Sequence, residues 1–208
     1  MKNKLLVSAI LLSMCIMRLF AEPISFSGGY TQLKMQQDHQ VIQLKEGAHV
    51  TIGSLSIDAD TIEISGKDYA LLTCSGTVLV KDSDKGLTIR CNEISYDRSS
   101  QIIRVNSFIE LDDTSDALHA TASGLSYNRG SGKIDLQVAV KLYHDADGKL
   151  MKCNADYLSF DTEQNNLALL GNAKVTYAKD IYDAQAISVD LKDNRITMDG
   201  SIRGTVND

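Results

Sequence analysis

The sequence predicts an all-β protein built from one strand-and-turn unit that recurs about five times. Three observations carry this prediction. Apolar and polar residues alternate with a period of two over much of the chain. A four-residue phrase returns at intervals of about 30 residues. Proline occurs once, at Pro23, so no predicted strand is interrupted, and no window beyond the N-terminal segment shows clear helical periodicity.

The N-terminal segment has the pattern of a secretory signal peptide. Residues 1–4 are basic and residues 5–14 are apolar, which matches the n-region and h-region of such a signal. The apolar run is shorter than the roughly 20 residues that a membrane-spanning helix needs. We therefore expect cleavage after Ala21 and a single domain over residues 22–208. Lipidation at Cys15, or retention of the segment as an anchor, stays open as an alternative.

The recurring phrase consists of an aliphatic residue, serine, an aromatic or aliphatic residue, and aspartate or asparagine. Its successive first residues are 32, 31, 33 and 29 positions apart. A small residue and then a polar one begin three positions before each copy. The copies are a worn one at Ile62–Ser65 and then Ile94–Asp97, Leu125–Asn128, Leu158–Asp161 and Ile187–Asp190, and the pairs before them are Ala59-Asp60, Cys91-Asn92, Ala122-Ser123, Ala155-Asp156 and Ala184-Gln185.

Each phrase is followed by a turn-forming cluster, a short apolar run, a break, and another alternating stretch. The breaks fall at Gly76, Asn106, Gly171 and Gly200. Clusters of Gly, Asn, Asp and Ser mark the hairpin turns between strands. We therefore predict three strands in each unit of about 30 residues. A single unit cannot bury its own apolar face, but stacked units share a continuous core.

Charge excludes one class of function. Residues 1–21 hold three of the 21 basic residues and no acidic one, so the remainder carries 18 basic against 27 acidic residues. A nucleic-acid-binding protein needs a basic surface, and an acidic chain also adheres poorly to anionic membranes. We expect no nucleic-acid partner.

No catalytic, cofactor or metal motif is present, so we expect no enzyme, no cofactor and no metal site. The four histidines share no ligand spacing; they are His39, His49, His119 and His144. Asp82 to Gly86, with Glu93 beyond it, superficially resembles a calcium loop, but its glycine is one position early and its flanks are strands. Asp112–Asp116 and Asp145–Gly148 are interpreted as acidic hairpin turns.

The cysteines favour no particular chemistry. Cys74, Cys91 and Cys153 are an odd set in a compartment where disulfides form. We interpret each as a small buried residue, and pairing of Cys74 with Cys91 stays open.

The remaining candidates for a site are the apolar residues at those alternate strand positions that we expect to point inward. They either fill a core or line an apolar groove able to hold acyl chains. These lipid-groove candidates are Ile57, Ile62, Ile64, Ile89, Ile94, Tyr96, Val105, Phe108, Leu125, Tyr127, Leu158, Phe160, Val175, Ile187 and Val189.

Two segments resemble the OstA-like, lipopolysaccharide-transport A family of periplasmic proteins. That family's pattern is Gly-Asn-Val/Ala-x-Val, a short turn, and then Ile/Leu-x-Ala-Asp. Residues Gly47 to Asp60 are similar to it, with Ala48 in place of asparagine. Gly171-Asn172-Ala173-Lys174-Val175 fits more closely and leads through Tyr182 to Gln185. The resemblance covers about residues 27–206 of the chain.

The resemblance implies an open antiparallel β-jellyroll of roughly sixteen strands, with two facing sheets that open like a V. Acyl chains of lipopolysaccharide or another glycolipid would lie inside and head groups outside. The resemblance also implies end-to-end stacking, with further copies and with jellyroll domains of membrane-anchored partners, across the periplasm. Alternatives are a structural or adhesive β-repeat protein with a filled core, and an inner-membrane-anchored partner in the same transport system.

Overall fold

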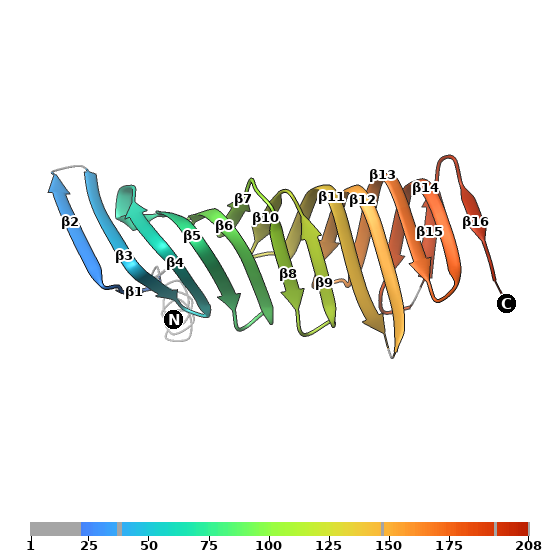
Figure 1. Ribbon diagram of the computed structural model, residues 1–208, viewed down its shortest axis with the longest axis horizontal. Coiled ribbons are helices and arrows are strands. Elements are labelled where there is room, and N and C mark those ends of the chain that lie inside the picture. The colour runs from blue at the N-terminus through green and yellow to red at the C-terminus, as the bar shows by residue number, and fades with distance from the viewer. Residues whose placement is uncertain (1–21, 37–38, 147, 194, 208) are drawn as a thin grey trace, which may run out of the picture.

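The chain forms an elongated, all-β molecule whose strands are antiparallel, which confirms the predicted fold class (Figure 1). The computed structural model describes residues 22–36, 39–146, 148–193 and 195–207. The predicted signal segment and its cleavage site lie outside these residues. Among the described residues, no helix is long and apolar enough to cross a membrane.

The described residues form sixteen strands and one short 3-10 helix, η1 (Lys67–Tyr69). The strands are β1 (Ile24–Ser27), β2 (Tyr30–Gln36), β3 (His39–Ile52), β4 (Leu55–Ser65), β5 (Leu71–Asp82), β6 (Leu87–Asp97), β7 (Ile102–Val105), β8 (Ile109–Asp113), β9 (Leu118–Ala122), β10 (Leu125–Asn128), β11 (Lys133–Ala146), β12 (Lys149–Asp161), β13 (Asn166–Tyr177), β14 (Asp180–Asp190), β15 (Arg195–Asp199) and β16 (Arg203–Thr205).

The long strands pass through both layers of the molecule, with a register shift near the middle of each. The ladder between β5 and β6 shifts between Ser75 and Val78, and that between β13 and β14 shifts between Leu170 and Ala173. Two pairs of short strands show the division into layers most clearly. The two halves of β6 pair separately with β7 and with β8, and the two halves of β11 pair separately with β10 and with β9.

The repeat therefore holds two long, bent strands, or their split equivalents, where the sequence predicts three strands. The difference has a local cause. A bulge adds residues to one strand of an antiparallel pair and bends it. The added residues also interrupt the period-two pattern, so a continuous bent strand has the sequence pattern of two short strands.

The bend explains why two features of the repeat occur together. One is the small residue followed by a polar residue, and the other is the glycine at the break. Gly76 has a φ of 90°, and a Cβ atom at this position would overlap the carboxylate of Asp60 on the neighbouring strand. The same carboxylate accepts a hydrogen bond from the amide of Thr77 at 3.2 Å. Gly171, with a φ of 72°, lies against Asp156 in the same way. In both cases the polar residue of the pair lies over the bend of the next strand.

Acidic residues end the strands by forming turns. The Oδ1 atom of Asp161 accepts hydrogen bonds from the amides of Glu163 and Gln164 at 3.1 and 2.9 Å. Asp113 and Asp145 accept equivalent bonds from the amides that follow them. These contacts confirm the interpretation of both acidic segments as hairpin turns.

A continuous apolar core lies between the two layers and extends from Ile42 in β3 to Val189 in β14. The strand order places β1 and β2 at one end of the molecule and β15 and β16 at the other (Figure 1). All four are edge strands, so each end of the molecule presents backbone groups that lack a partner strand.

Candidate functional site

The structure places the lipid-groove candidates in one interior, with a single exception. All of them except Phe108 are buried in the core. Phe108 is 58% exposed, so its predicted inward orientation is wrong. It lies in the break between β7 and β8, where the alternation of inward and outward side chains restarts at Ile109. A role of the buried residues in lipid binding stays a prediction.

The interior side chains pack against one another in this conformation. The largest fully buried ones include Tyr127 and Phe160 from the recurring phrase. Acyl chains would therefore occupy the centre only if the two sheets moved apart. Two openings that are already present lie near the N-terminal end, and another, of about 440 Å³, lies beside Asp113, Leu118 and Leu150.

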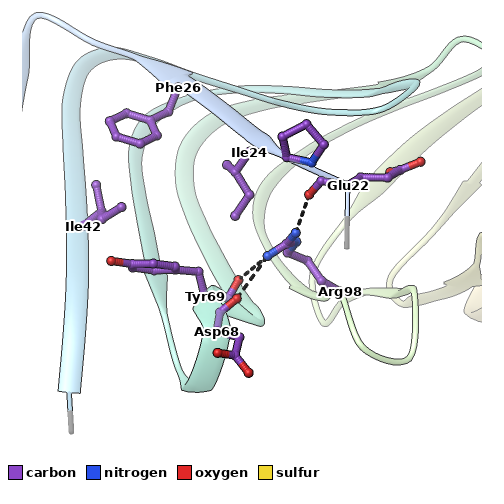
Figure 2. Close-up of a pocket in the computed structure, with 8 residues that line it drawn as sticks. Glu22, Ile24, Phe26, Ile42, Asp68, Tyr69 and Arg98 are labelled. Carbon is purple, nitrogen blue, oxygen red and sulfur yellow. Dashed lines mark hydrogen bonds between the residues drawn. The ribbon is translucent and has the colours of Figure 1, made fainter. Parts of the chain in front are cut away.

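One opening is a pocket of about 410 Å³ at the end of the interior (Figure 2). Ile24 and Phe26 from β1 lie across it from Ile42 of β3 and Tyr69 of η1. These side chains make its walls largely apolar. Arg98 lies at its inner border, where an anionic or polar part of a ligand would meet a cation.

Arg98 holds three backbone carbonyl groups together at this border. Its Nη1 atom donates to the carbonyl oxygens of Asp68 and Tyr69 at 3.2 and 3.1 Å, and its Nη2 atom donates to that of Glu22 at 2.6 Å (Figure 2). The guanidinium therefore ties the segment before β1 to η1. A second pocket, of about 930 Å³, shares Glu22, Asp68 and Arg98 with the first and reaches Leu71 and Tyr96.

Two rows of turns border the interior, and we call them its lips. The second pocket lies against the second row. The first lip comprises residues 53–54, 83–86, 114–117 and 148, and the second comprises residues 66–70, 98–101, 129–132 and 162–165. Lys85 on the first lip lies 3.9 Å from Glu163 on the second. Because both side chains are partly exposed to solvent, that pair adds little stability.

A buried polar network joins the lips at the centre. Asp82 at the end of β5 accepts a hydrogen bond from Nε of Arg129 at 2.7 Å and another from Ser54 Oγ at 2.8 Å. The hydroxyl of Tyr127 donates to the same carboxylate at 3.2 Å. Arg129 also donates to Tyr96 Oη at 3.1 Å and to Ser54 Oγ at 3.0 Å. Two charges are thus fixed in a largely apolar environment.

The network holds its groups in defined protonation states. Burial opposes ionisation of Asp82, but the hydrogen bonds from Arg129 and Ser54 outweigh it and lower the pKa of this carboxyl. Burial and the adjacent Asp82 raise the pKa of the Tyr127 hydroxyl, which stays protonated. The network is therefore an ion pair supported by neutral donors.

The sequence does not predict this network, because Asp82 stands out there only as the first residue of a segment that superficially resembles a calcium loop. The alternation of inward and outward residues along β5 does indicate that Asp82 points inward. Val78 and Val80 are inward residues two positions apart, and Asp82 continues that series. Its partner Arg129 is 47 residues away, and no sequence pattern connects the two.

The remaining candidates are structural. Cys74, Cys91 and Cys153 are free thiols, and burial raises their pKa values to about 12, 11 and 12. They therefore stay protonated and weakly nucleophilic at neutral pH. Over residues 22–207, apart from the few positions not described, no group of three or more His, Cys, Asp or Glu side chains comes together to hold a metal ion.

The antiparallel strands and the apolar interior between the two layers define a β-jellyroll. Residues 31–195 match the family described as the LptA/(LptD N-terminal domain) LPS transport protein family. The chain belongs to this family, which is one of transport proteins and not of enzymes.

One solved structure is similar over most of both chains. It is that of LptH, described as the LptA-homologous periplasmic component of the lipopolysaccharide transport device of Pseudomonas aeruginosa. The similarity covers 90% of this chain and 96% of LptH, with 12% identity and a TM-score of 0.29. No curated protein matches the chain.

Proposed function

We propose that this protein carries lipopolysaccharide or a related glycolipid through the periplasm, with the acyl chains shielded between its two sheets. The observation that carries this proposal is the apolar interior, which is continuous along the molecule and opens at its N-terminal end into an apolar pocket bordered by Arg98. Membership of a lipopolysaccharide-transport family supports the identity of the cargo.

The ends of the molecule support a bridging role. An open edge strand pairs readily with another strand, and main-chain hydrogen bonds then extend the sheet. Phe26, Tyr30 and Leu33 are exposed apolar residues on β1 and β2, and Ile202 and Val206 are exposed beside β16. Copies of this chain, or related jellyroll domains at the inner and outer membranes, would therefore stack end to end into a continuous conduit.

Photo-crosslinking tests whether lipid enters the interior. A photoreactive amino acid at Tyr96 or Phe160, both buried, should capture lipid extracted with the protein and detected by mass spectrometry. Ser95 and Ser159 are the matched controls, because they are the adjacent residues and point to the opposite face of the strand. Capture at the serine positions alone would contradict the proposal.

The alternative of a structural protein with a permanently filled core draws on the close packing of the interior side chains. Lipid extraction from the purified native protein separates the two functions. A carrier should retain lipid in amounts near one molecule per chain, whereas a structural protein should yield none.

A further inference from the structure

Three buried polar side chains recur at one position of the repeat. They are Asp82, Asp113 and His144, spaced 31 residues apart. The strand ladders place them in one row on the first sheet, because Asp82 pairs with Leu87, Leu87 with Asp113, Asp113 with Leu118, and Leu118 with His144. We call these three side chains the polar row. Neighbouring members are two strands apart, which corresponds to about 10 Å.

An aromatic row faces the polar row from the second sheet. Tyr96 pairs with Ile103, and Ile103 pairs with Tyr127. Tyr127 pairs with Ile134, and Ile134 pairs with Phe160. The hydrogen bond from the Tyr127 hydroxyl to Asp82 shows that the two rows meet across the interior. Most members of both rows lie at or next to the end of their strand, and His144 lies two residues before the end of β11, so together the rows form a seam just inside the lips.

Part of the hydrogen-bonding capacity of this seam is unused. Asp82 is occupied by Arg129, Ser54 and Tyr127. Asp113, in contrast, is hydrogen-bonded only within its own turn, by the amides of Ser115 and Asp116 and by the Ser115 side chain. Burial raises the pKa of the Asp113 carboxyl, and the amide bonds offset only part of that rise.

His144 supplies the second, independent observation. Its side chain is only 7% exposed, and its Nδ1 atom has no hydrogen-bond partner among the described residues. A buried polar atom without a partner is costly and calls for an explanation. Asp113 is bonded only within its own turn and Nδ1 of His144 has no partner, so these two neighbouring members of the polar row are available to a ligand.

We propose that the seam binds the polar junction of the lipid cargo, where acyl chains meet the head group, and that it selects lipids with an amide N–H or hydroxyl group at this junction. This inference rests on the proposed function. A carboxylate accepts hydrogen bonds from such donors, and so does Nδ1 of an imidazole whose proton is on Nε2. The seam holds two carboxyl groups, and the guanidinium of Arg129 already pairs with one of them, Asp82, so the seam disfavours a phosphate.

Two detergents that differ in one hydrogen-bond donor test the selection directly. N-decanoylglucamine has an amide N–H at the junction of chain and head group, and N-decanoyl-N-methylglucamine carries a methyl group there. Binding to the wild-type protein would be measured by calorimetry below the micelle concentration. We expect the N–H compound to bind about tenfold more tightly, as for a hydrogen bond to a charged acceptor.

Substitutions then test which residues cause the preference for the N–H compound. Asp113→Leu and His144→Phe should each reduce it to about twofold or less while binding of the N-methyl compound is retained, because each removes one acceptor. Met151→Leu is the control, since Met151 pairs with His144 in the same row but is apolar. It should leave the preference unchanged.

The outcomes separate this inference from the proposed function. Equal binding of the two detergents to the wild-type protein would overturn the seam and leave lipid binding intact. Binding of neither compound would contradict the apolar groove itself. A preference that persists in both Asp113→Leu and His144→Phe would also overturn the assignment. The comparison of the two detergents uses the wild-type protein alone. It therefore tests the proposal even if a variant does not fold.

Discussion

At the scale of single residues, the central feature is the ion pair between Asp82 and Arg129. A buried charge pair is not by itself evidence of high stability, because desolvation offsets much of the attraction. Removing one partner is different, since the other charge then remains buried and unpaired. The pair also connects the two lips. Its loss should therefore weaken the contact between the two sheets more than the hydrogen bonds between neighbouring strands.

We therefore expect Asp82→Asn to lower the free energy of unfolding by about 3 kcal/mol at neutral pH, measured by denaturant titration. The lowered pKa of Asp82 means that its contribution is present above the ordinary value of 3.8 and is lost as the pH falls through the folded-state pKa. The deficit of the variant should therefore shrink in acid.

Asp84→Asn is the matched control, because Asp84 is an exposed acid in the same turn, and it should change stability by less than about 0.5 kcal/mol. Equal effects of the two substitutions would show that the pair is unimportant. Asp82→Leu combined with Arg129→Met should recover much of the loss, because no unpaired charge remains.

At the scale of secondary-structure elements, the bent strand is the repeating unit. Its bend combines a residue with positive φ and a polar side chain from the preceding strand, as at Gly76 and Asp60. Replacing Gly76 with alanine introduces a strained backbone conformation and a steric overlap with Asp60. We expect Gly76→Ala to cost about 1–3 kcal/mol.

The measurement is the denaturant midpoint at unchanged slope. Gly124→Ala is the control, since a Cβ atom there makes only ordinary contacts, the nearest at 3.6 Å. Adding Asp60→Ala to the Gly76→Ala variant should restore part of the stability, because it removes the overlap and leaves the strain. A Gly76→Ala protein as stable as Gly124→Ala would contradict this account of the bend.

The same element shows what the sequence could and could not predict. The phrase ending at Asp97 or Asp161 predicted strand ends and turns correctly, because period-two burial and turn-forming side chains are local signals. The bend was missed, because an inserted residue with positive φ resembles a strand break. The Asp82–Arg129 pair was missed for another reason: residues 47 positions apart meet only after both sheets have formed.

At the scale of the whole molecule, the two open ends determine how copies assemble. Edge strands are protected in most proteins by charges, bulges or covering segments. Here Leu33, in the middle of edge strand β2, is 53% exposed. The wild-type protein should therefore form rods whose length increases with concentration, and sedimentation velocity combined with small-angle scattering would detect them.

Leu33→Asp should shift the protein towards the monomer, because a charge at the edge must be buried or repelled when another strand docks. The loss should be at least tenfold in association constant, the equivalent of about 1.4 kcal/mol. Val138→Asp is the control, since Val138 is 62% exposed but lies at the bend of β11, far from both ends along the strand order. Rods that persist in Leu33→Asp but disappear in Val138→Asp would place the contact on the flank of the molecule, and a conduit built end to end would then be excluded.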